Sequence, residues 1–293
     1  MSETRIARRY DRGVVAVEGE EAASFLHGVV TCTVKTLEPG EARLGGLLTP
    51  QGKLLFDFLL TPVDGGFLIE IERGRVADFV KRLTLYRLRA KATIADRSDD
   101  FAVLLAFGGA VPEIAGAVAF TDPRAAALGT HLLVPGAVAD GIATTASPSD
   151  WHALRIAAGV PESGLDFALG EVFPHDVDMD DLSGVDFKKG CFVGQEVVSR
   201  MKHRGTARRR TILAHAREAR PAWPDVGTEI VCGEKGIGTL GSAHEGVALA
   251  LVRLDRAKEA LDSGDPIEVG GVRVTLELPA FASFDWPKET SSE

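Results

Sequence analysis

The chain contains the stretch Phe187-Lys188-Lys189-Gly190-Cys191-Phe192-Val193-Gly194-Gln195-Glu196, and a helix is predicted to begin near Val193. A thiol beside two lysines holds its thiolate form more readily than a free cysteine, because nearby positive charge favours the anion. Glycines on both sides leave the backbone φ angles unrestricted, and a helix N-terminus adds unpaired N–H groups. The stretch therefore predicts an activated thiol in a tight turn. A buried cysteine is the alternative, because unpaired cysteines are among the most buried residues.

The overall composition is that of a folded protein. The chain has 293 residues, of which 45% are apolar and 26% are charged, so we expect two domains, with three as an alternative. The formal net charge of −9 disfavours a protein that coats nucleic acid. No apolar run approaches the roughly 18 residues of a membrane-spanning helix. The N-terminal residues lack the apolar core of a secretory signal peptide. We therefore expect a cytoplasmic protein without membrane contact.

The three cysteines, Cys32, Cys191 and Cys232, lie far apart and form no C-x-x-C pair. Their odd number and wide spacing argue against a disulfide framework or a four-cysteine zinc site. The chain also has too few cysteines to hold a four-cysteine iron–sulfur cluster by itself. This pattern fits a reducing cytoplasm.

Hydrophobic patterns predict a mixture of helices and antiparallel hairpins before residue 205. Helices are predicted at 19–30, 76–83 and 148–159. Ser149 is the predicted N-cap of the last helix. Strict alternation from Leu88 to Ile94 predicts a half-buried strand. Other strands are predicted at 13–18, 43–48, 53–60, 67–71, 101–107 and 131–134. This arrangement favours an α+β fold over a doubly wound parallel sheet.

After Gly205 the pattern changes to short strands separated by glycine turns. These strands are predicted at 208–215, 228–232, 236–240, 247–254 and 272–278. They predict a small all-β domain at the C-terminus. The polar tail at 288–293 is predicted to be disordered.

Three further features each have two interpretations. A basic run is either a solvated face or an anion site near Cys191, because arginine forks bind carboxylates. It consists of Arg200, Lys202, His203, Arg204, Arg208, Arg209 and Arg210. The acidic stretch around His175 is either a metal site or an exposed turn, and the turn is favoured. Trp151 is either a platform for a flat heterocycle or a core residue.

The residues from Lys189 to Glu196 match the pattern K-G-C-[FY]-x-G-Q-E at every defined position. With this motif the chain resembles the YgfZ family of folate-binding proteins. That family is tied to the maintenance of iron–sulfur enzymes and is related to the glycine-cleavage aminomethyltransferase. The resemblance covers about residues 10 to 285. It includes Phe25-Leu26-His27-Gly28, Leu47 to Phe58, Tyr86-Arg87-Leu88-Arg89 and Arg155 to Pro161.

The resemblance implies an α+β fold of three domains in a ring around a central cavity. Two of these would be ferredoxin-like α+β domains, and the third would be a C-terminal β-barrel. The first domain would combine residues 1–48 with 140–205, and the second would span 49–139. The barrel would span 206–287.

The resemblance also implies that tetrahydrofolate, or a one-carbon derivative, binds in the cavity. Lys189 and Cys191 are the implied functional pair. The implied folate-binding residues are Trp151, Gly190, Gln195, Glu196, Asp57 and Arg200. The implied function is assembly or repair of iron–sulfur clusters by a monomer that meets iron–sulfur enzymes transiently, with a link to tRNA modification.

Two departures from the aminomethyltransferases argue against aminomethyl transfer. Ala157 stands where those enzymes carry a glutamate, and Phe56-Asp57 stands where they tend to have two acidic residues. Missing carboxylates would remove pterin hydrogen bonds or a proton acceptor. A folate-dependent transferase or demethylase that uses Asp57 is the alternative function. Nucleic-acid binding through Arg200 to Arg210 is a third, disfavoured by the net charge.

Overall fold

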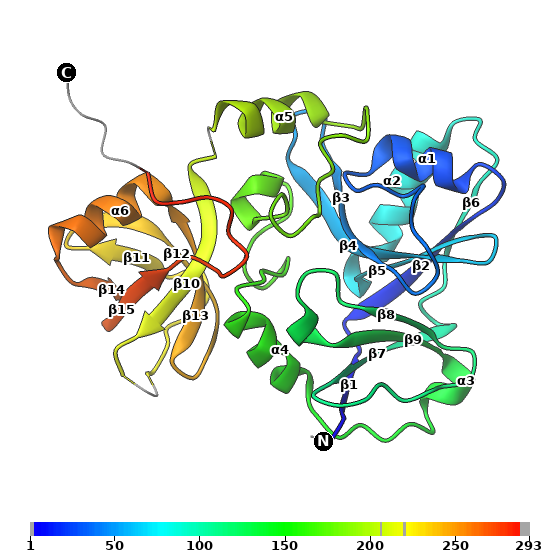
Figure 1. The fold of residues 1–293 in the computed structure, drawn as a ribbon, viewed down its shortest axis with the longest axis horizontal. Coiled ribbons are helices and arrows are strands. Elements are labelled where there is room, and N and C mark those ends of the chain that lie inside the picture. The colour runs from blue at the N-terminus through cyan, green and yellow to red at the C-terminus, as the bar shows by residue number, and fades with distance from the viewer. Residues whose placement is uncertain (1–2, 206, 219–220, 288–293) are drawn as a thin grey trace.

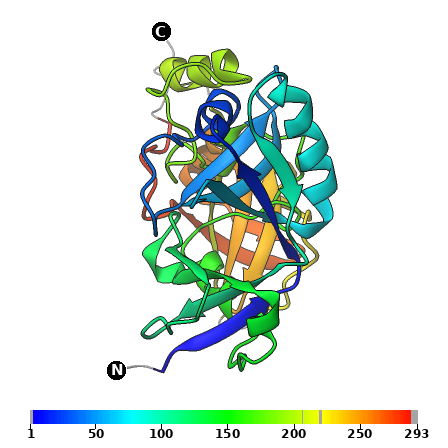
Figure 2. The same cartoon turned by 90° about the vertical axis from the view of Figure 1, so that its right-hand side faces the viewer.

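The structure is a computed structural model that describes residues 3–205, 207–218 and 221–287. A closed β-barrel occupies one end of the molecule, and two antiparallel sheets occupy the other (Figure 1). Helix α4 (Pro148–Ala157) and the irregular segment of residues 158–184 lie between the barrel and the sheets. Seen from the side of the sheets, the barrel lies behind them (Figure 2). The predicted α+β class with a C-terminal β-barrel is confirmed.

The larger sheet has five strands in the order β3-β4-β5-β2-β6. These are β2 (Arg12–Glu18), β3 (Arg43–Leu48), β4 (Leu54–Val63), β5 (Gly66–Glu72) and β6 (Thr93–Asp96). Helices α1 (Ala22–Val29) and α2 (Val76–Arg87) share an apolar core with one face of this sheet. Phe79 of α2 lies in that core against the rings of Phe56 and Phe58. This packing keeps α1 and α2 on the outer side of the sheet.

The smaller sheet has four strands in the order β1-β7-β9-β8. These are β1 (Arg5–Arg9), β7 (Phe101–Phe107), β8 (Val118–Thr121) and β9 (Thr130–Pro135). The short helix α3 (Gly136–Ala139) packs on its outer face. Strand β1 was not predicted, because three arginines among its five residues hide the alternation.

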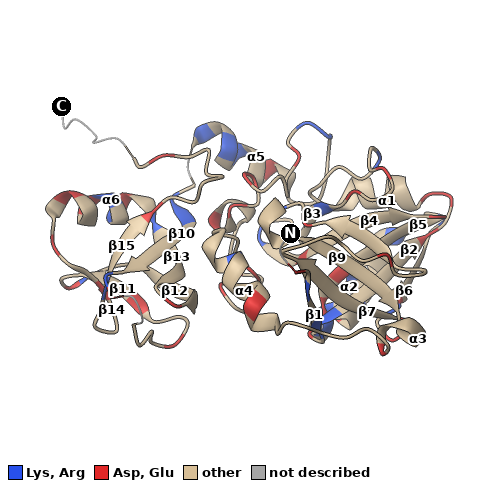
Figure 3. Ribbon diagram, turned by 60° about the horizontal axis from the view of Figure 1, so that its bottom comes forward, with Lys and Arg blue, Asp and Glu red and all other residues tan. Residues whose placement is uncertain are grey.

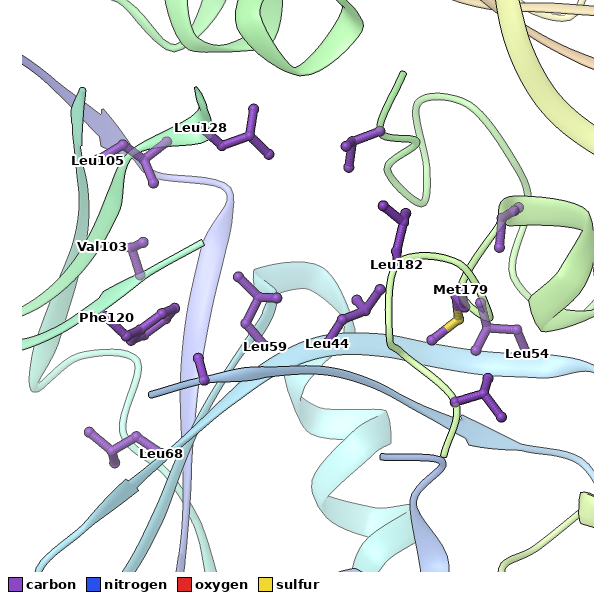
Figure 4. Close-up of a cluster of buried hydrophobic side chains, with 14 of the residues drawn as sticks. Leu44, Leu54, Leu59, Leu68, Val103, Leu105, Phe120, Leu128, Met179 and Leu182 are labelled. Atoms are coloured by element: carbon purple, nitrogen blue, oxygen red, sulfur yellow. The ribbon is translucent and has the colours of Figure 1, made fainter. Parts of the chain in front are cut away.

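The apolar core between the two sheets also holds side chains of the irregular segment. Leu44 and Leu59 of the larger sheet, Leu105 of the smaller sheet, and Met179 and Leu182 of the irregular segment belong to the same cluster (Figure 4). Because residues two apart in a strand point to the same face, Asp57 lies on the same face of β4 as Leu59. A carboxylate therefore enters the apolar space between the sheets.

The barrel closes with its strands in the order β10-β13-β12-β11-β14-β15. These are β10 (Arg209–Ala216), β11 (Glu229–Cys232), β12 (Lys235–His244), β13 (Val247–Arg253), β14 (Ile267–Val269) and β15 (Val272–Glu277). Helix α6 (Leu254–Ser263) packs on it through Leu254, Ala257 and Ala260. Both α6 and β14 were missed by the sequence analysis.

Three predictions about elements are corrected. The alternating stretch from Leu88 to Ile94 is not one strand, because α2 continues to Arg87 and β6 begins at Thr93. The N-cap of α4 is Ser147, whose hydroxyl accepts from the backbone N–H of Asp150, and Pro148 fills the first helical position. The predicted domain boundary at residues 48/49 falls in the turn between β3 and β4, which are hydrogen-bonded neighbours.

Within the described ranges, no helix is long and apolar enough to cross a membrane. The predicted disordered tail at 288–293 lies outside the described residues.

Candidate functional site

Cys191 lies on an exposed loop immediately before α5 (Gln195–Arg204). Gly190 and Gly194 flank this loop with φ angles of +99° and +78°, which favour glycine. A Cβ atom at Gly194 would lie 2.5 Å from the carbonyl oxygen of Thr49, whereas one at Gly190 would meet nothing within 4 Å. Gly194 therefore lets the start of α5 sit against the β3–β4 turn, and Gly190 leaves the space beside Cys191 open.

Lys189 points away from the solvent and back into the protein. Its ammonium group donates to the backbone carbonyl oxygens of Val30 at 2.5 Å and Cys32 at 2.8 Å. Burial lowers the pKa of Lys189 to about 8. The sequence predicts that Lys189 and Cys191 act together. In the structure, the Lys189 ammonium group is engaged by two carbonyl groups of another segment. Lys189 is an anchor of the Cys191 loop in this geometry.

Other contacts tie the same loop to residues 27–34. The backbone N–H of Asp186 donates to the carbonyl of Thr31 at 3.0 Å, and Thr33 donates to the Asp186 carboxylate. His27 Nε2 lies 3.2 Å from the carbonyl oxygen of Lys189. Because the other His27 nitrogen, Nδ1, accepts from the Val34 backbone N–H at 3.4 Å, Nε2 is the donor. The loop is exposed at its tip and held firmly at its base.

The three thiols differ in access to solvent. Cys191 is exposed, Cys232 is half-buried and Cys32 is buried. Burial raises the pKa of Cys32 to about 11, so Cys32 stays a neutral thiol at physiological pH. Cys191 is therefore the thiol that a second protein can reach most readily, and the alternative of a buried Cys191 is wrong.

Gln195, Glu196 and Arg200 all lie on α5, as predicted for residues near the thiol. Arg200 forms an ion pair with Glu196 one helical turn away, and both side chains are exposed. Lys202 pairs with Asp180 at 3.3 Å. The structure thus groups Gly190, Gln195, Glu196 and Arg200 along the loop and the start of α5.

The basic run is divided by the fold. The ribbon is blue, the colour of lysine and arginine, on α5 and at β10 (Figure 3). Arg210 of β10 is buried and donates to the Asp180 carboxylate at 2.6 Å and to the carbonyl of His175 at 2.9 Å. The predicted run is therefore not one solvated face, because β10 turns Arg210 toward the acidic segment.

That acidic segment is buried rather than exposed, so the favoured interpretation of His175 to Asp181 as an exposed turn is wrong. His175 and Asp178 are fully buried. Burial raises the pKa of Asp178 well above its usual range and lowers the pKa of His175 to about 4. Among the described residues, no group of three His, Cys, Asp or Glu side chains is arranged to hold a metal ion. The segment serves to join the barrel to the sheets through Arg210.

Asp57 and Trp151, the other predicted folate-binding residues, lie in the interior. Trp151 is fully buried, and its indole N–H donates to the carbonyl of Leu128 at 2.9 Å. Arg9 and Arg124 lie over its ring, 5.0 and 5.7 Å from the ring atoms' centroid. Trp151 is a core residue here, and the prediction that it stacks on a pterin is corrected, because other side chains cover its ring.

Asp57 is half-buried on β4. Burial raises its pKa above the usual range, against the proximity of the Ser163 hydroxyl and the charge of Arg12. Ser163 is itself buried, and its Oγ has no hydrogen-bond partner within the described ranges. A raised carboxyl pKa beside an unpartnered hydroxyl is typical of a ligand-binding surface.

A buried charge network surrounds Asp57, and the sequence analysis missed it. Glu70 of β5 contacts His131 Nδ1 at 2.7 Å, and Asp122 contacts His131 Nε2 at 2.9 Å. Arg124 pairs with Asp122 at 2.7 Å, and Arg12 pairs with Glu70 at 3.0 Å. These contacts join the two sheets. No local sequence signal marks the contacts of Glu70, because Arg12 and His131 are 58 and 61 positions away from it in the chain.

The network continues toward the barrel through a second set of ion pairs. Arg9 pairs with Glu162 at 2.5 Å. Arg155 of α4 pairs with Asp166 at 2.6 Å and donates to Ser242 of the barrel at 2.9 Å. Every one of these ions is satisfied by a partner, as burial of charge requires. The network therefore holds the sheets, α4 and the barrel in one arrangement.

A cavity of about 510 Å³ opens beside this network. It is lined by residues 40–44, Thr121, Asp122, Pro123, Leu182 and Ser183. Cavities of about 300–1,000 Å³ with apolar walls and a few polar groups are typical of small-molecule sites. Asp122 at its wall is linked to Arg124, whose charge also lowers the pKa of Asp57.

The chain is similar in sequence to several proteins that share one name. It is 34% identical over 225 residues to the human "Iron-sulfur cluster assembly factor IBA57, mitochondrial", covering 68% of this chain and 63% of that protein. It is 32% identical over 227 residues to the Mycosarcoma maydis homologue, covering 71% and 56%. These homologues are iron–sulfur cluster assembly factors. For Neurospora crassa the identity is 30%, over 69% of this chain and 51% of the homologue. The chain thus spans between about half and two thirds of the length of these relatives.

Two further comparisons concern the fold. Residues 208–284 match the model of the CAF17 C-terminal β-barrel domain. The crystal structure of glycine cleavage system aminomethyltransferase T from Bartonella henselae superposes with a TM-score of 0.77, covering 98% of this chain and 88% of that one. Sequence identity to it is 16%, so the likeness shows the fold alone.

The expectation of a cytoplasmic location is contradicted by these comparisons. The relatives are named as mitochondrial proteins. The expectation rested on the cysteine pattern and on the lack of an apolar secretory-signal core, and neither feature distinguishes the two locations.

Proposed function

We propose that this chain is a YgfZ-type iron–sulfur cluster assembly factor in which Cys191 acts as a thiolate ligand or redox group. The observation that carries the proposal is the exposure of Cys191 at the tip of a loop whose base is anchored by Lys189 and Asp186. An anchored base presents the sulfur at a defined place, and an exposed tip admits a second protein. The assembly activity of the relatives supports this assignment.

A single thiol supplies one ligand, whereas an iron–sulfur cluster is held by about four. The cluster would therefore be cargo shared with a partner that contributes the other ligands. Cys191 would bind iron through its thiolate, the form that ligates metals. Client iron–sulfur enzymes, tRNA-modifying enzymes among them, would meet the chain transiently while it remains a monomer.

We also propose tetrahydrofolate, or a one-carbon derivative, as the ligand of the cavity beside the buried charge network. Its lining residues do not include Asp57 and Ser163, and the Asp122–Arg124 pair links it to Asp57. Asp57 and the unpartnered Ser163 hydroxyl provide an acceptor and a donor suited to the polar edge of a pterin. Bound tetrahydrofolate would supply a reduced pterin that carries one-carbon units. Within the chain, Arg124 and Arg12 would stabilise the carboxylate form of Asp57. Leu44 and Leu182 would exclude water from the cavity.

Complementation tests the thiol role. In a strain lacking this protein, Cys191→Ala should lower the activity of iron–sulfur enzymes at least tenfold relative to the wild-type chain. Cys232→Ser, which changes the half-buried thiol of the barrel, is the matched control and should complement fully. Full complementation by Cys191→Ala would show that the thiol has no such role.

Calorimetric titration with tetrahydrofolate tests the cavity. Asp57→Asn and Ser163→Ala should each weaken binding about tenfold, the usual cost of an unpaired buried polar group. Glu196→Gln, on the exposed start of α5, distinguishes a folate site in the cavity from a folate site at the Cys191 loop. Equal affinity of all three variants and the wild type would exclude the cavity as the folate site.

A folate-dependent transferase or demethylase is the second candidate, favoured by the raised pKa of Asp57. A carboxylate with a raised pKa accepts a proton more readily near neutral pH. Incubation with tetrahydrofolate and an aminomethyl donor, whose carbon is already at the oxidation level of formaldehyde, should then form methylene-tetrahydrofolate and release ammonia. Normal folate binding without turnover would eliminate this candidate and leave the assembly role in place.

A further inference from the structure

The end of α2 and the turn after it form an exposed apolar and basic surface. We define the α2 patch as Lys81, Arg82, Leu85, Leu88 and Arg89. Positions three and four apart share one side of a helix, so Lys81, Arg82 and Leu85 lie on one side of α2. Leu88 and Arg89 follow directly after the last helical residue, Arg87. Leu85 is 64% exposed and Leu88 is 85% exposed. Two leucines this exposed, three positions apart in the chain and beside basic residues, are typical of an interaction surface.

Leu88 occupies a backbone conformation that normally belongs to glycine. Its φ and ψ are +49° and −108°, and the N–H of Ala90 donates to the carbonyl of Arg87 at 2.9 Å. These are the features of a type II′ turn with Leu88 in the first central position, where glycine dominates. An exposed leucine gains no burial to offset this strain. Strained residues of this kind cluster at functional sites.

The charges of the α2 patch lack partners of opposite sign. Within the described ranges, Lys81, Arg82 and Arg89 form no ion pair, whereas the nearby Lys91 pairs with Glu20 at 3.1 Å. Three uncompensated cations around two leucines stand out in a chain with net charge −9. Complementary potentials guide association, so the surface fits a partner with an acidic rim around an apolar hollow.

Helix α1 connects this patch to the Cys191 loop. At its N-terminal end, the N–H of Glu21 donates to the carbonyl of Lys91 at 3.2 Å. At its C-terminal end, His27 contacts the carbonyl of Lys189. Eight helical residues span about 12 Å, and α1 and α2 share one apolar core with the larger sheet. One protein can therefore cover the patch and reach the thiol.

We infer that the α2 patch is the docking surface for an acidic iron–sulfur protein, which inserts Leu88 into an apolar hollow and brings its cluster site to Cys191. The acidic character follows from the patch alone. The iron–sulfur character rests on the proposed function. A second copy of this chain and a nucleic acid are the occupants that the test must exclude.

The first arm identifies the occupant. The full-length chain carries the photo-crosslinker p-benzoylphenylalanine in place of Leu85, and cells are irradiated. An adduct with an acidic iron–sulfur protein is expected. The same crosslinker at Tyr10, which is 72% exposed in the turn between β1 and β2, is the control and should not give this adduct. An adduct with the chain itself, with a basic protein or with RNA, or no adduct at all, would overturn the inference.

The second arm separates docking from folding. Leu88→Gly removes the strain and the side chain together, so it should raise the melting temperature by about 2 °C and weaken binding of the captured, cluster-free protein about tenfold. Glu245→Gly, at the other end of the molecule, also relieves a positive φ of +48° and should leave binding unchanged. Unchanged binding by Leu88→Gly would overturn the inference.

The third arm distinguishes this inference from the proposed function. Cys191→Ser should bind the cluster-free partner with wild-type affinity, because docking does not use the thiol. If Cys191→Ser also supports full iron–sulfur enzyme activity, the proposed thiol role fails while the docking surface stands. If Cys191→Ser abolishes binding of the cluster-free partner, the patch is not the docking surface.

Discussion

The ammonium group of Lys189 donates a 2.8 Å hydrogen bond to the carbonyl oxygen of Cys32, a residue 157 positions earlier in the chain. This contact fastens the base of the Cys191 loop to the segment after α1. It also removes the Lys189 charge from the exposed tip of the loop. The lysine of the motif thus acts first on the position of the thiol.

Replacing Lys189 with methionine should loosen the loop without a large loss of stability. The methionine keeps the volume but not the hydrogen bonds, so alkylation of Cys191 should change by severalfold while the melting temperature falls by only a few degrees. Mass spectrometry of alkylated peptides measures the rate. A rate equal to the wild type would contradict the anchoring role.

The same variant should change the pH dependence of stability. Burial lowers the pKa of Lys189 to about 8, against about 10.4 in an unfolded chain. Between these values the unfolded state binds more protons, so stability rises with pH. After allowance for solvent screening we expect a gain of about 1 kcal/mol from pH 8 to pH 10.5. Denaturant titrations should show this gain in the wild type and not in Lys189→Met.

Alanine at the two loop glycines should have unequal effects. Gly194→Ala places a Cβ 2.5 Å from the Thr49 carbonyl and forces α5 away from the β3–β4 turn, so we expect a loss of about 3 kcal/mol. Gly190→Ala meets open space and carries only backbone strain of about 1–2 kcal/mol. Urea unfolding measures both. Equal losses would show that the contact with the Thr49 carbonyl does not explain the need for glycine at position 194.

His131 should stabilise the fold most strongly in acid. Glu70 and Asp122 flank its buried ring and raise its pKa, although burial opposes them. A raised pKa means that this stability is fully present below the unfolded value of about 6.5 and is lost as pH rises through the folded value. His131→Gln should cost about 3 kcal/mol at pH 6 and less at pH 9.

His203→Gln, on the exposed end of α5, is the control for that experiment. It should leave the free energy of unfolding unchanged at both pH values. A loss for His131→Gln that does not depend on pH would show that the His131 ring acts through packing rather than charge.

The thiols should react in the order of their exposure. Iodoacetamide at pH 7.5 should modify Cys191 fastest, Cys232 more slowly and Cys32 only after unfolding, because Cys32 is buried and its pKa is raised to about 11. Peptide mapping after short labelling checks this order. Early modification of Cys32 in the folded protein would contradict the packing of the segment after α1.

Local patterns predicted the elements that carry their own signal. Alternation found β4, β5 and β7, and glycine-spaced strands found most of the barrel. The pattern failed from Leu88 to Ile94, where alternating leucines and arginines follow a helix end and a tight turn rather than a strand. Alternation shows only which residues differ in polarity. It predicts a strand when the apolar residues are buried, and the exposed Leu88 in a turn is not buried.

The sequence predicted one of the two parts of the candidate site. The motif around Cys191 identified the thiol, because glycines and lysines at fixed spacing are local features. In the interior half, the family resemblance named Asp57, whereas Ser163 and the Glu70–His131–Asp122 relay had no local signal. Glu70 of the larger sheet meets His131 of the smaller sheet, and Ser163 lies outside the named strands, so only the packed chain brings these groups together.

The sequence by itself determined the α+β class, the C-terminal β-barrel and the thiol at the start of a helix, because each depends on periodicity or on neighbouring residues. The tertiary structure decided that Lys189 anchors the loop, that Trp151 belongs to the core and that the acidic segment pairs with Arg210. These outcomes depend on burial and on ion pairs between distant segments. Burial changes what a charged or aromatic side chain can do, and burial is a property of the packed chain alone.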